Sequence, residues 1–124
     1  MPVIVGVALG GAFGASARYV LDRFIEQHTE SVFPWSTFVI NATGCFVIGV
    51  VIETLVDRHH LPAWIRVGLV VGVLGGYTTF STFSQEIFSL LESSDVGVAL
   101  TYAAASVGVG VVAVYAGTLL GRSL

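Results

Sequence analysis

Long uncharged stretches alternate with short polar connections along this chain. No Asp, Glu, Lys or Arg occurs within residues 2–17, 31–52, 67–85 and 96–121. A helix that crosses a hydrocarbon core of about 30 Å needs roughly 20 mostly apolar residues. The pattern therefore predicts a single all-α domain over residues 1–124 with four transmembrane helices, at about 2–26, 35–56, 62–91 and 96–121.

Composition supports a membrane protein and excludes several other classes. Hydrophobic residues make up 55% of the chain and charged residues 10%, whereas soluble domains carry about 25% charged residues. The net charge is -3 and lysine is absent, so there is no basic cluster that would neutralise nucleic-acid phosphates. The single cysteine, Cys45, cannot form an internal disulfide or a metal cage. We expect a multi-pass protein of the plasma membrane whose partner is the lipid bilayer. We do not expect the protein to be an enzyme.

Orientation in the membrane is only weakly encoded. Four spans place both termini and the second connection, near 57–61, on the same side. Three arginines lie on that side, against two associated with the other: Arg58, Arg66 and Arg122 against Arg18 and Arg23. This small difference slightly favours termini inside the cell, and insertion in both orientations, with an antiparallel dimer, is the alternative. The first apolar run is not expected to be a cleaved leader, because no basic residue precedes it.

The third span is predicted to be interrupted near 75–79. Gly75 and Gly76 have low helix propensity, and the β-branched Thr78 and Thr79 follow them. Backbone groups freed inside a membrane need partners, so broken helices occur where the backbone lines a cavity or binds an ion. Freed carbonyls suit a cation, and a new helix N-terminus suits an anion. The alternative is that the glycines only allow close helix packing.

Aromatic and hydroxyl side chains follow this interruption in two adjacent stripes. Phe80 and Phe83 are three residues apart and share a helical face, and Thr79 and Thr82 share the neighbouring one. Hydroxyl groups donate to anions, and phenyl edges carry partial positive charge. Ordinary packing of the rings and hydrogen bonding of the hydroxyls to preceding carbonyls are the alternatives.

Other polar residues lie within the spans and have two interpretations each. Asn41 either joins helices or donates to a permeant species. Arg18 follows a run of small residues that predicts a packing face, and its spacing allows an ion pair with Asp22. Glu86 is either the polar end of a span or a carboxylate on an ion path. Four transmembrane helices enclose little space, so transport by this chain would require two or more copies.

Three motifs resemble those of the CrcB/Fluc fluoride channel family and occur in the same order. They are GGAFGASARY at 10–19, NATGCF at 41–46 and GGYTTFSTFS at 75–84. The TTFSTF run is the most specific, and the similarity in length and span number covers the whole chain. Small departures occur at Ala42, Thr43 and Cys45, which vary a segment that often carries other small or apolar residues.

The resemblance implies an antiparallel, dual-topology homodimer with two narrow pores that exports fluoride passively and lowers its toxicity. The implied pore residues are Phe80 and Phe83 for their ring edges, Asn41 for its amide, Ser81 and Thr82 for a hydroxyl track, and Tyr102 and Ser106 from the fourth span. A structural sodium ion would bind the backbone carbonyls of Gly75 and Thr78 at the dimer interface. Arg18 matches the arginine of the family's first helix.

Two other functions compete with this interpretation. A small proton-coupled multidrug exporter also has four short spans, but it needs a carboxylate deep in a span, and the first span has no acid before Asp22. A structural or assembly protein would explain the glycines but not a polar stripe beside a mid-membrane break. Dependence of transport on a proton gradient distinguishes the exporter.

Overall fold

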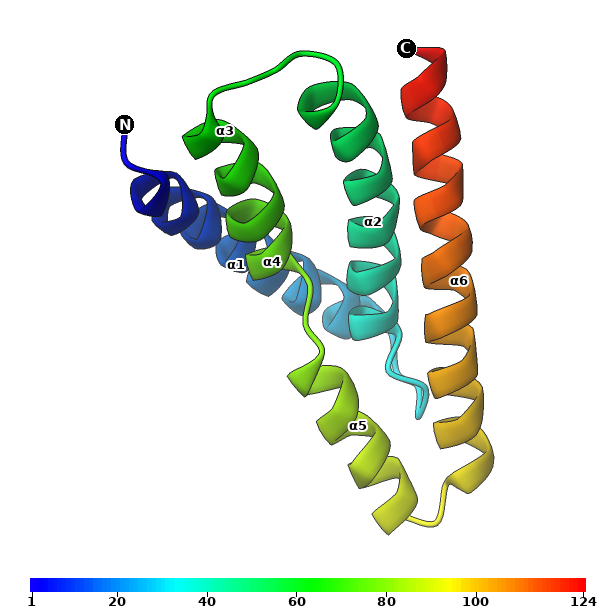
Figure 1. Cartoon of the computed structure of the whole chain (residues 1–124). Helices are drawn as coiled ribbons and strands as arrows, with labels where there is room; N and C mark the ends of the chain where they lie inside the picture. Colours follow the sequence, from blue (N-terminus) through cyan, green and yellow to red (C-terminus); the bar gives the residue numbers. More distant parts are fainter.

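The computed structural model describes residues 1–124 and consists only of helices and short connections (Figure 1). The helices are α1 (Val3–His28), α2 (Trp35–Val51) continued by the π-helical η1 (Ile52–Val56), α3 (Ala63–Val67) continued by the π-helical η2 (Gly68–Leu74) and by α4 (Gly75–Tyr77), α5 (Ser81–Glu92), and α6 (Val96–Ser123). Four helical stretches are long and apolar enough to cross a membrane: Val3–His28, Trp35–Val56, Ala63–Glu92 and Val96–Ser123. The predicted all-α fold with four spans is confirmed, and the chain is a multi-pass membrane protein.

Proline marks the start of three of the spans. Pro2, Pro34 and Pro62 immediately precede α1, α2 and α3. Proline has no N–H to donate and fixes φ, so it suits the residue before a helix and prevents a preceding helix from continuing. The observed ends of the four spans lie within two residues of the predicted ends, because prolines and charged residues delimit the apolar runs.

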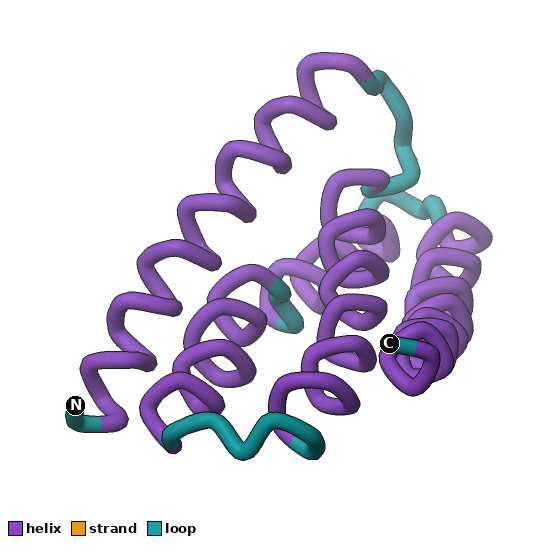
Figure 2. Tube along the Cα trace, turned by 90° about the horizontal axis from the view of Figure 1, so that it is seen from above, coloured by secondary structure: helices purple, strands orange, loops and turns teal.

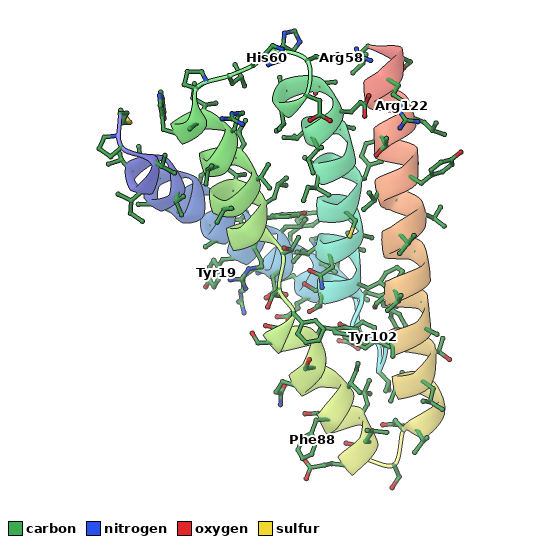
Figure 3. The ribbon with its side chains drawn as sticks, viewed as in Figure 1. Tyr19, Arg58, His60, Phe88, Tyr102 and Arg122 are labelled. Carbon is green, nitrogen blue, oxygen red and sulfur yellow. The ribbon has the colours of Figure 1, made fainter.

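The termini and the connection over 57–62 lie at one end of the molecule, and the other two connections lie at the opposite end (Figure 1). Viewed from above, α1 and α6 are on opposite sides, with α2 and the first half of the third span between them (Figure 2). At the end that holds the termini, the Arg122 Nε atom is 3.6 Å from Glu53 Oε1, and Arg58 donates to the Arg122 carbonyl at 2.8 Å (Figure 3).

Glycines bring α1 into backbone contact with the first half of the third span. A Cβ atom built on any of three glycines, each four residues from the next, would collide with the facing backbone. The facing pairs are Gly6 with Trp64, Gly10 with Gly68, and Gly14 with Val73. Residues four apart lie on one helix face, so this stripe is the packing face that the run of small residues predicts.

A second glycine contact joins α2 and α6, where Gly49 meets Val114 and Gly117 meets Phe46. Many large apolar side chains remain exposed on the chain, among them Phe13, Leu100, Val111 and Tyr115. A single copy in a membrane would present these side chains to lipid or to another protein chain.

Candidate functional site

The third span loses helical geometry at Thr78–Phe80, between α4 and α5 (Figure 1). Thr78 adopts an extended conformation with φ -87° and ψ 161°. The sequence predicted the interruption near 75–79, but Gly75 and Gly76 stay helical, so the break lies later than the glycine pair suggests. Gly76 is held in the helix by packing: a Cβ atom there would lie 2.9 Å from the Gly11 carbonyl of α1.

Gly75 differs from its neighbour, because it packs against nothing in the chain. A Cβ atom on Gly75 would meet only the Val70 carbonyl, at 3.9 Å, and the residue is exposed. Close helix packing therefore accounts for Gly76 but not for Gly75.

Asn41 replaces backbone hydrogen bonds that the break removes. Its Nδ2 donates to the Thr79 carbonyl at 2.9 Å, and its Oδ1 accepts from the Thr79 N–H at 2.9 Å. A primary amide has two N–H donors, so one hydrogen of Nδ2 remains after this pairing. Asn41 thus joins α2 to the interruption and keeps one free donor.

Arg18 reaches the same segment from α1. Its Nε donates to the Gly76 carbonyl at 3.1 Å. No ion pair joins Arg18 to Asp22; instead Asp22 accepts a hydrogen bond from Ser36 of α2. The ion pair that the sequence spacing allows is therefore not formed, because both side chains bind groups that are distant in sequence.

Three carbonyls at the interruption have no hydrogen-bond partner. In a continuous helix the Gly75 carbonyl would accept from the Thr79 N–H, and the Thr78 carbonyl from the Thr82 N–H. Here the Thr79 N–H donates to Asn41, and the Thr82 N–H donates to the Thr79 hydroxyl at 3.3 Å. The carbonyls left free are those of Gly75, Tyr77 and Thr78.

The start of α5 leaves backbone donors free in turn. The N–H groups of Phe80, Ser81 and Phe83 have no partner in the chain, and the N-terminus of a helix carries partial positive charge. The Thr79 hydroxyl lies 3.2 Å from that of Thr82, so the predicted neighbouring hydroxyls are present. Ser81 is exposed beside them. The interruption therefore places free acceptors on one side and free donors on the other.

Aromatic rings continue from α5 onto α6. The rings of Phe80 and Phe83 share a face, with centroids 5.8 Å apart. Phe83 also packs edge-on against Tyr102, at 5.0 Å. Tyr102 is fully buried between α6 and its neighbours (Figure 3) and donates to Glu86 Oε1 at 3.0 Å. Phe80 is 76% exposed, so only one of the two phenylalanines is supported by packing within the chain.

A cavity of about 400 Å³ opens beside the interruption. It is lined by these residues of the predicted site: Asn41, Gly75, Thr78, Phe80, Phe83 and Ser106. The Ser106 hydroxyl is buried without a hydrogen-bond partner, and Cys45 also lines the wall. Three residues of the predicted site do not line this cavity: Ser81, Thr82 and Tyr102. Thr82 contacts the hydroxyl of Thr79, and Tyr102 contacts the ring of Phe83, and both of these partners line the cavity.

Two contacts at the site were not predicted from the sequence. The backbone of Thr79 is the partner of Asn41, whereas the sequence predicted roles only for the β-branching and the hydroxyl of Thr79. The Tyr77 hydroxyl lies 2.8 Å from that of Thr43 on α2. The spacing of Thr79 and Thr82 is that of a residue capping a helix start, which was the available signal for Thr79. No local pattern connects Tyr77 with Thr43.

Comparison with known proteins places the chain in a family. The family described as CrcB-like protein, Camphor Resistance (CrcB), matches residues 5–118. The chain is 42% identical over 120 residues to the fluoride-specific ion channel FluC of Acidobacterium capsulatum, covering 95% of this chain and 94% of that protein. It is 41% identical over 121 residues to the protein of that name from Rhizobium meliloti, covering 98% and 97%.

A third relative extends the similarity to the full length of both chains. The fluoride-specific ion channel FluC of Flavobacterium psychrophilum is 36% identical over 124 residues, which is 100% of each protein. The family match spans all four membrane helices, including the interruption and its partners on α1 and α2. The chain therefore belongs to the CrcB family.

Proposed function

We propose that this protein is a passive, fluoride-selective channel that releases fluoride from the cytoplasm and so lowers its toxicity. Relatives that match over nearly their whole length are named fluoride-specific ion channels. Those names describe channels and not enzymes, in agreement with the non-enzymatic function predicted from the sequence. The observation that carries the proposal is the cluster of free donors and phenyl rings at the interrupted third span.

Fluoride is a small, strongly hydrated anion, so a selective path must replace its water with hydrogen-bond donors. The remaining Nδ2 hydrogen of Asn41 is such a donor, and the cavity that Asn41 lines also contains the Ser106 hydroxyl, which has no partner. The ring edges of Phe80 and Phe83 carry partial positive charge and lie along the same path. The hydroxyls of Ser81 and Thr82 extend this set, and Tyr102, whose hydroxyl donates to Glu86, supports the Phe83 ring beside the path.

The conducting unit is an antiparallel dimer inserted in both orientations. The cavity beside the interruption is open on one side, and Phe80 at its wall is largely exposed. A second copy would close this side and shield the ring from lipid. The arginine distribution, three on one side of the membrane against two, directs insertion only weakly, which is compatible with both orientations.

A structural sodium ion binds the carbonyls of Gly75 and Thr78 at the interface of the two copies. Unwound backbone carbonyls in membrane helices are typical sodium ligands. These two carbonyls have no partner in the chain, and Gly75 is exposed without packing against any element. The residues present therefore fit a cation, and two copies would supply four carbonyl oxygens.

Fluoride efflux from liposomes that contain the purified protein tests the channel. We expect fast fluoride release without a proton gradient, read with a fluoride electrode, and little chloride release from matched liposomes. Release that requires a proton gradient would instead support the exporter, and no release from correctly folded protein would contradict transport of fluoride.

The variant that tests the pore donor is Asn41→Asp, which keeps the size of the side chain but replaces its N–H donors with an oxygen. We expect fluoride release to be suppressed in this variant. Release at the native rate would contradict the role of Asn41 as a pore donor while leaving the channel assignment in place.

A further inference from the structure

Arg18 continues the glycine stripe of α1 at the point where the third span loses its helix. Gly6, Gly10, Gly14 and Arg18 are spaced by four residues and therefore lie along one helix face. The three glycines contact the backbone of the third span, and Arg18 donates from Nε to the carbonyl of Gly76. The stripe thus ends in a charged donor directed at the interruption.

The carbonyl that Arg18 binds lies between the two carbonyls that are proposed to bind sodium. Gly76 stands between Gly75 and Thr78 in the chain, and a continuous helix would pair its carbonyl with the Phe80 N–H. That N–H is displaced by the break and has no partner. Without Arg18, the Gly76 carbonyl would be a further unpaired acceptor in the membrane, and the segment would be free to rotate to satisfy it.

We propose that Arg18 is a positioning residue for the interruption, and this inference rests on the proposed sodium site. By binding the Gly76 carbonyl, Arg18 fixes the backbone of α4 and so holds the carbonyls of Gly75 and Thr78 where both can bind a cation. The hydrogen bond is the essential feature, not the charge. A role through charge, such as attraction of the anion toward the pore, is the competing explanation.

Three substitutions separate the hydrogen bond from the charge. In Arg18→Gln the amide nitrogen is the same number of bonds from Cα as Nε of arginine, so the donor is kept and the charge is removed. In Arg18→Lys the charge is kept, but a methylene group occupies the place of Nε. Arg18→Met has similar length with neither donor nor charge.

The measurement is the thermal unfolding midpoint of the purified protein in detergent as sodium replaces a large organic cation at constant ionic strength. A ligand that binds the folded state raises this midpoint with its concentration. We expect the sodium concentration for half of the effect to stay within about twofold of the native value in Arg18→Gln. It should rise about tenfold in Arg18→Lys and Arg18→Met, as expected from loss of one hydrogen bond to a backbone carbonyl.

Any other order overturns the proposal. If the sodium concentration for half of the effect is native in Arg18→Lys but raised in Arg18→Gln, the effect is due to charge. If this concentration is native in all three variants, Arg18 has no role at the cation site. Tyr77→Phe is the matched control, because it removes a hydroxyl contact at the same interruption without touching the Gly76 carbonyl. Its sodium dependence should equal that of the native protein.

The same titration distinguishes failure of this inference from failure of the proposed function. If the native protein shows no sodium-dependent shift, both the sodium site and the role of Arg18 are contradicted. If the native protein responds to sodium but releases no fluoride from liposomes, the channel is contradicted, while the order of the Arg18 variants still decides the present inference.

Discussion

The packing of α1 against the third span differs from the interruption just beyond it in how the backbone is hydrogen-bonded. In the first region, Gly6, Gly10 and Gly14 let α1 approach the helical stretch of α3 and η2 until the two backbones touch. In the second, the helix is broken, and side chains of α1 and α2 take over part of its backbone hydrogen bonding. The glycine contact joins helical stretches that are continuous along the chain, whereas the interruption leaves free carbonyls and N–H groups.

This difference indicates where chemistry is possible in so small a chain. At the glycine contact the residues have no side chains, so no polar side chain is available there to a ligand. At the interruption, the polar side chains of Arg18 and Asn41 bind only some of the freed backbone groups. Gly76 and Thr79 gain partners, while Gly75 and Thr78 keep free carbonyls. The proposed cation site therefore depends on backbone carbonyls that gain no partner within the chain, next to a region of close helix packing.

The largest effect should come from breaking the glycine contact. In Gly14→Val the added side chain would collide with the backbone of Val73, and backbone cannot move aside as a flexible side chain can. We expect the free energy of unfolding to fall by about 3 kcal/mol or more, measured by equilibrium unfolding in mixed detergent micelles. Gly97→Ala is the control, because nothing lies within 4 Å of a Cβ atom there, and its stability should not fall.

The next largest effect should come from removing the compensation at the break. Asn41→Leu deletes both hydrogen bonds to Thr79 and leaves the half-buried carbonyl and N–H of Thr79 unpaired. We expect a loss of about 2–4 kcal/mol in the same unfolding measurement, since each unsatisfied group costs roughly 1–3 kcal/mol. A loss of unfolding free energy no larger than that of a typical exposed substitution, about 0.5 kcal/mol, would mean that water or another group replaces the amide. The interruption would then not depend on hydrogen bonds from α2.

The sequence predicted the four spans well because each one is bounded by charges or prolines. It located the interruption less well. The glycine pair suggested a break near 75–79, but Gly76 remains helical because of its contact with α1, and the chain departs from the helix only at Thr78. Propensity indicates where a helix is weak, and tertiary contacts decide which residue leaves it.

Contacts between distant residues were the part of the site that sequence could not supply. Spacing suggested Arg18 with Asp22, but both bind groups on other helices. Asn41 was correctly singled out as a polar group inside a span, yet its partner, Thr79, depends on how α2 lies against the third span. The resemblance to a family supplied roles for residues, whereas the hydrogen bonds that place those residues came only from the fold.

Substitution of the two phenylalanines should separate conduction from folding. Phe80 is mostly exposed, whereas Phe83 packs against Tyr102. We expect Phe80→Ile to change stability by less than about 0.5 kcal/mol and Phe83→Ile to cost about 1 kcal/mol. Both should lower fluoride efflux by roughly tenfold, if each ring edge contributes about 1.4 kcal/mol to the ion in transit. Efflux at the native rate in both variants would contradict the proposed role of the rings.

The smallest effect should follow loss of the hydroxyl contact between Tyr77 and Thr43. Thr43 also donates toward the carbonyls of Val39 and Ile40, so its hydroxyl stays satisfied when the tyrosine hydroxyl is removed. In Tyr77→Phe the ring should keep its packing over Gly44. We expect a loss of about 0.5 kcal/mol and unchanged fluoride efflux.

A double-mutant cycle with Thr43→Val checks this expectation, because it isolates the energy of the contact from the effects of each substitution. A coupling energy near zero would make this contact incidental to the interruption. A coupling as large as the Asn41 effect, with a matching fall in efflux, would mean that the segment is positioned by all of its side-chain contacts together. The position of the free carbonyls would then depend on α2 as much as on α1. The contrast would then have to include the contacts of α2 as well as the glycine contact of α1.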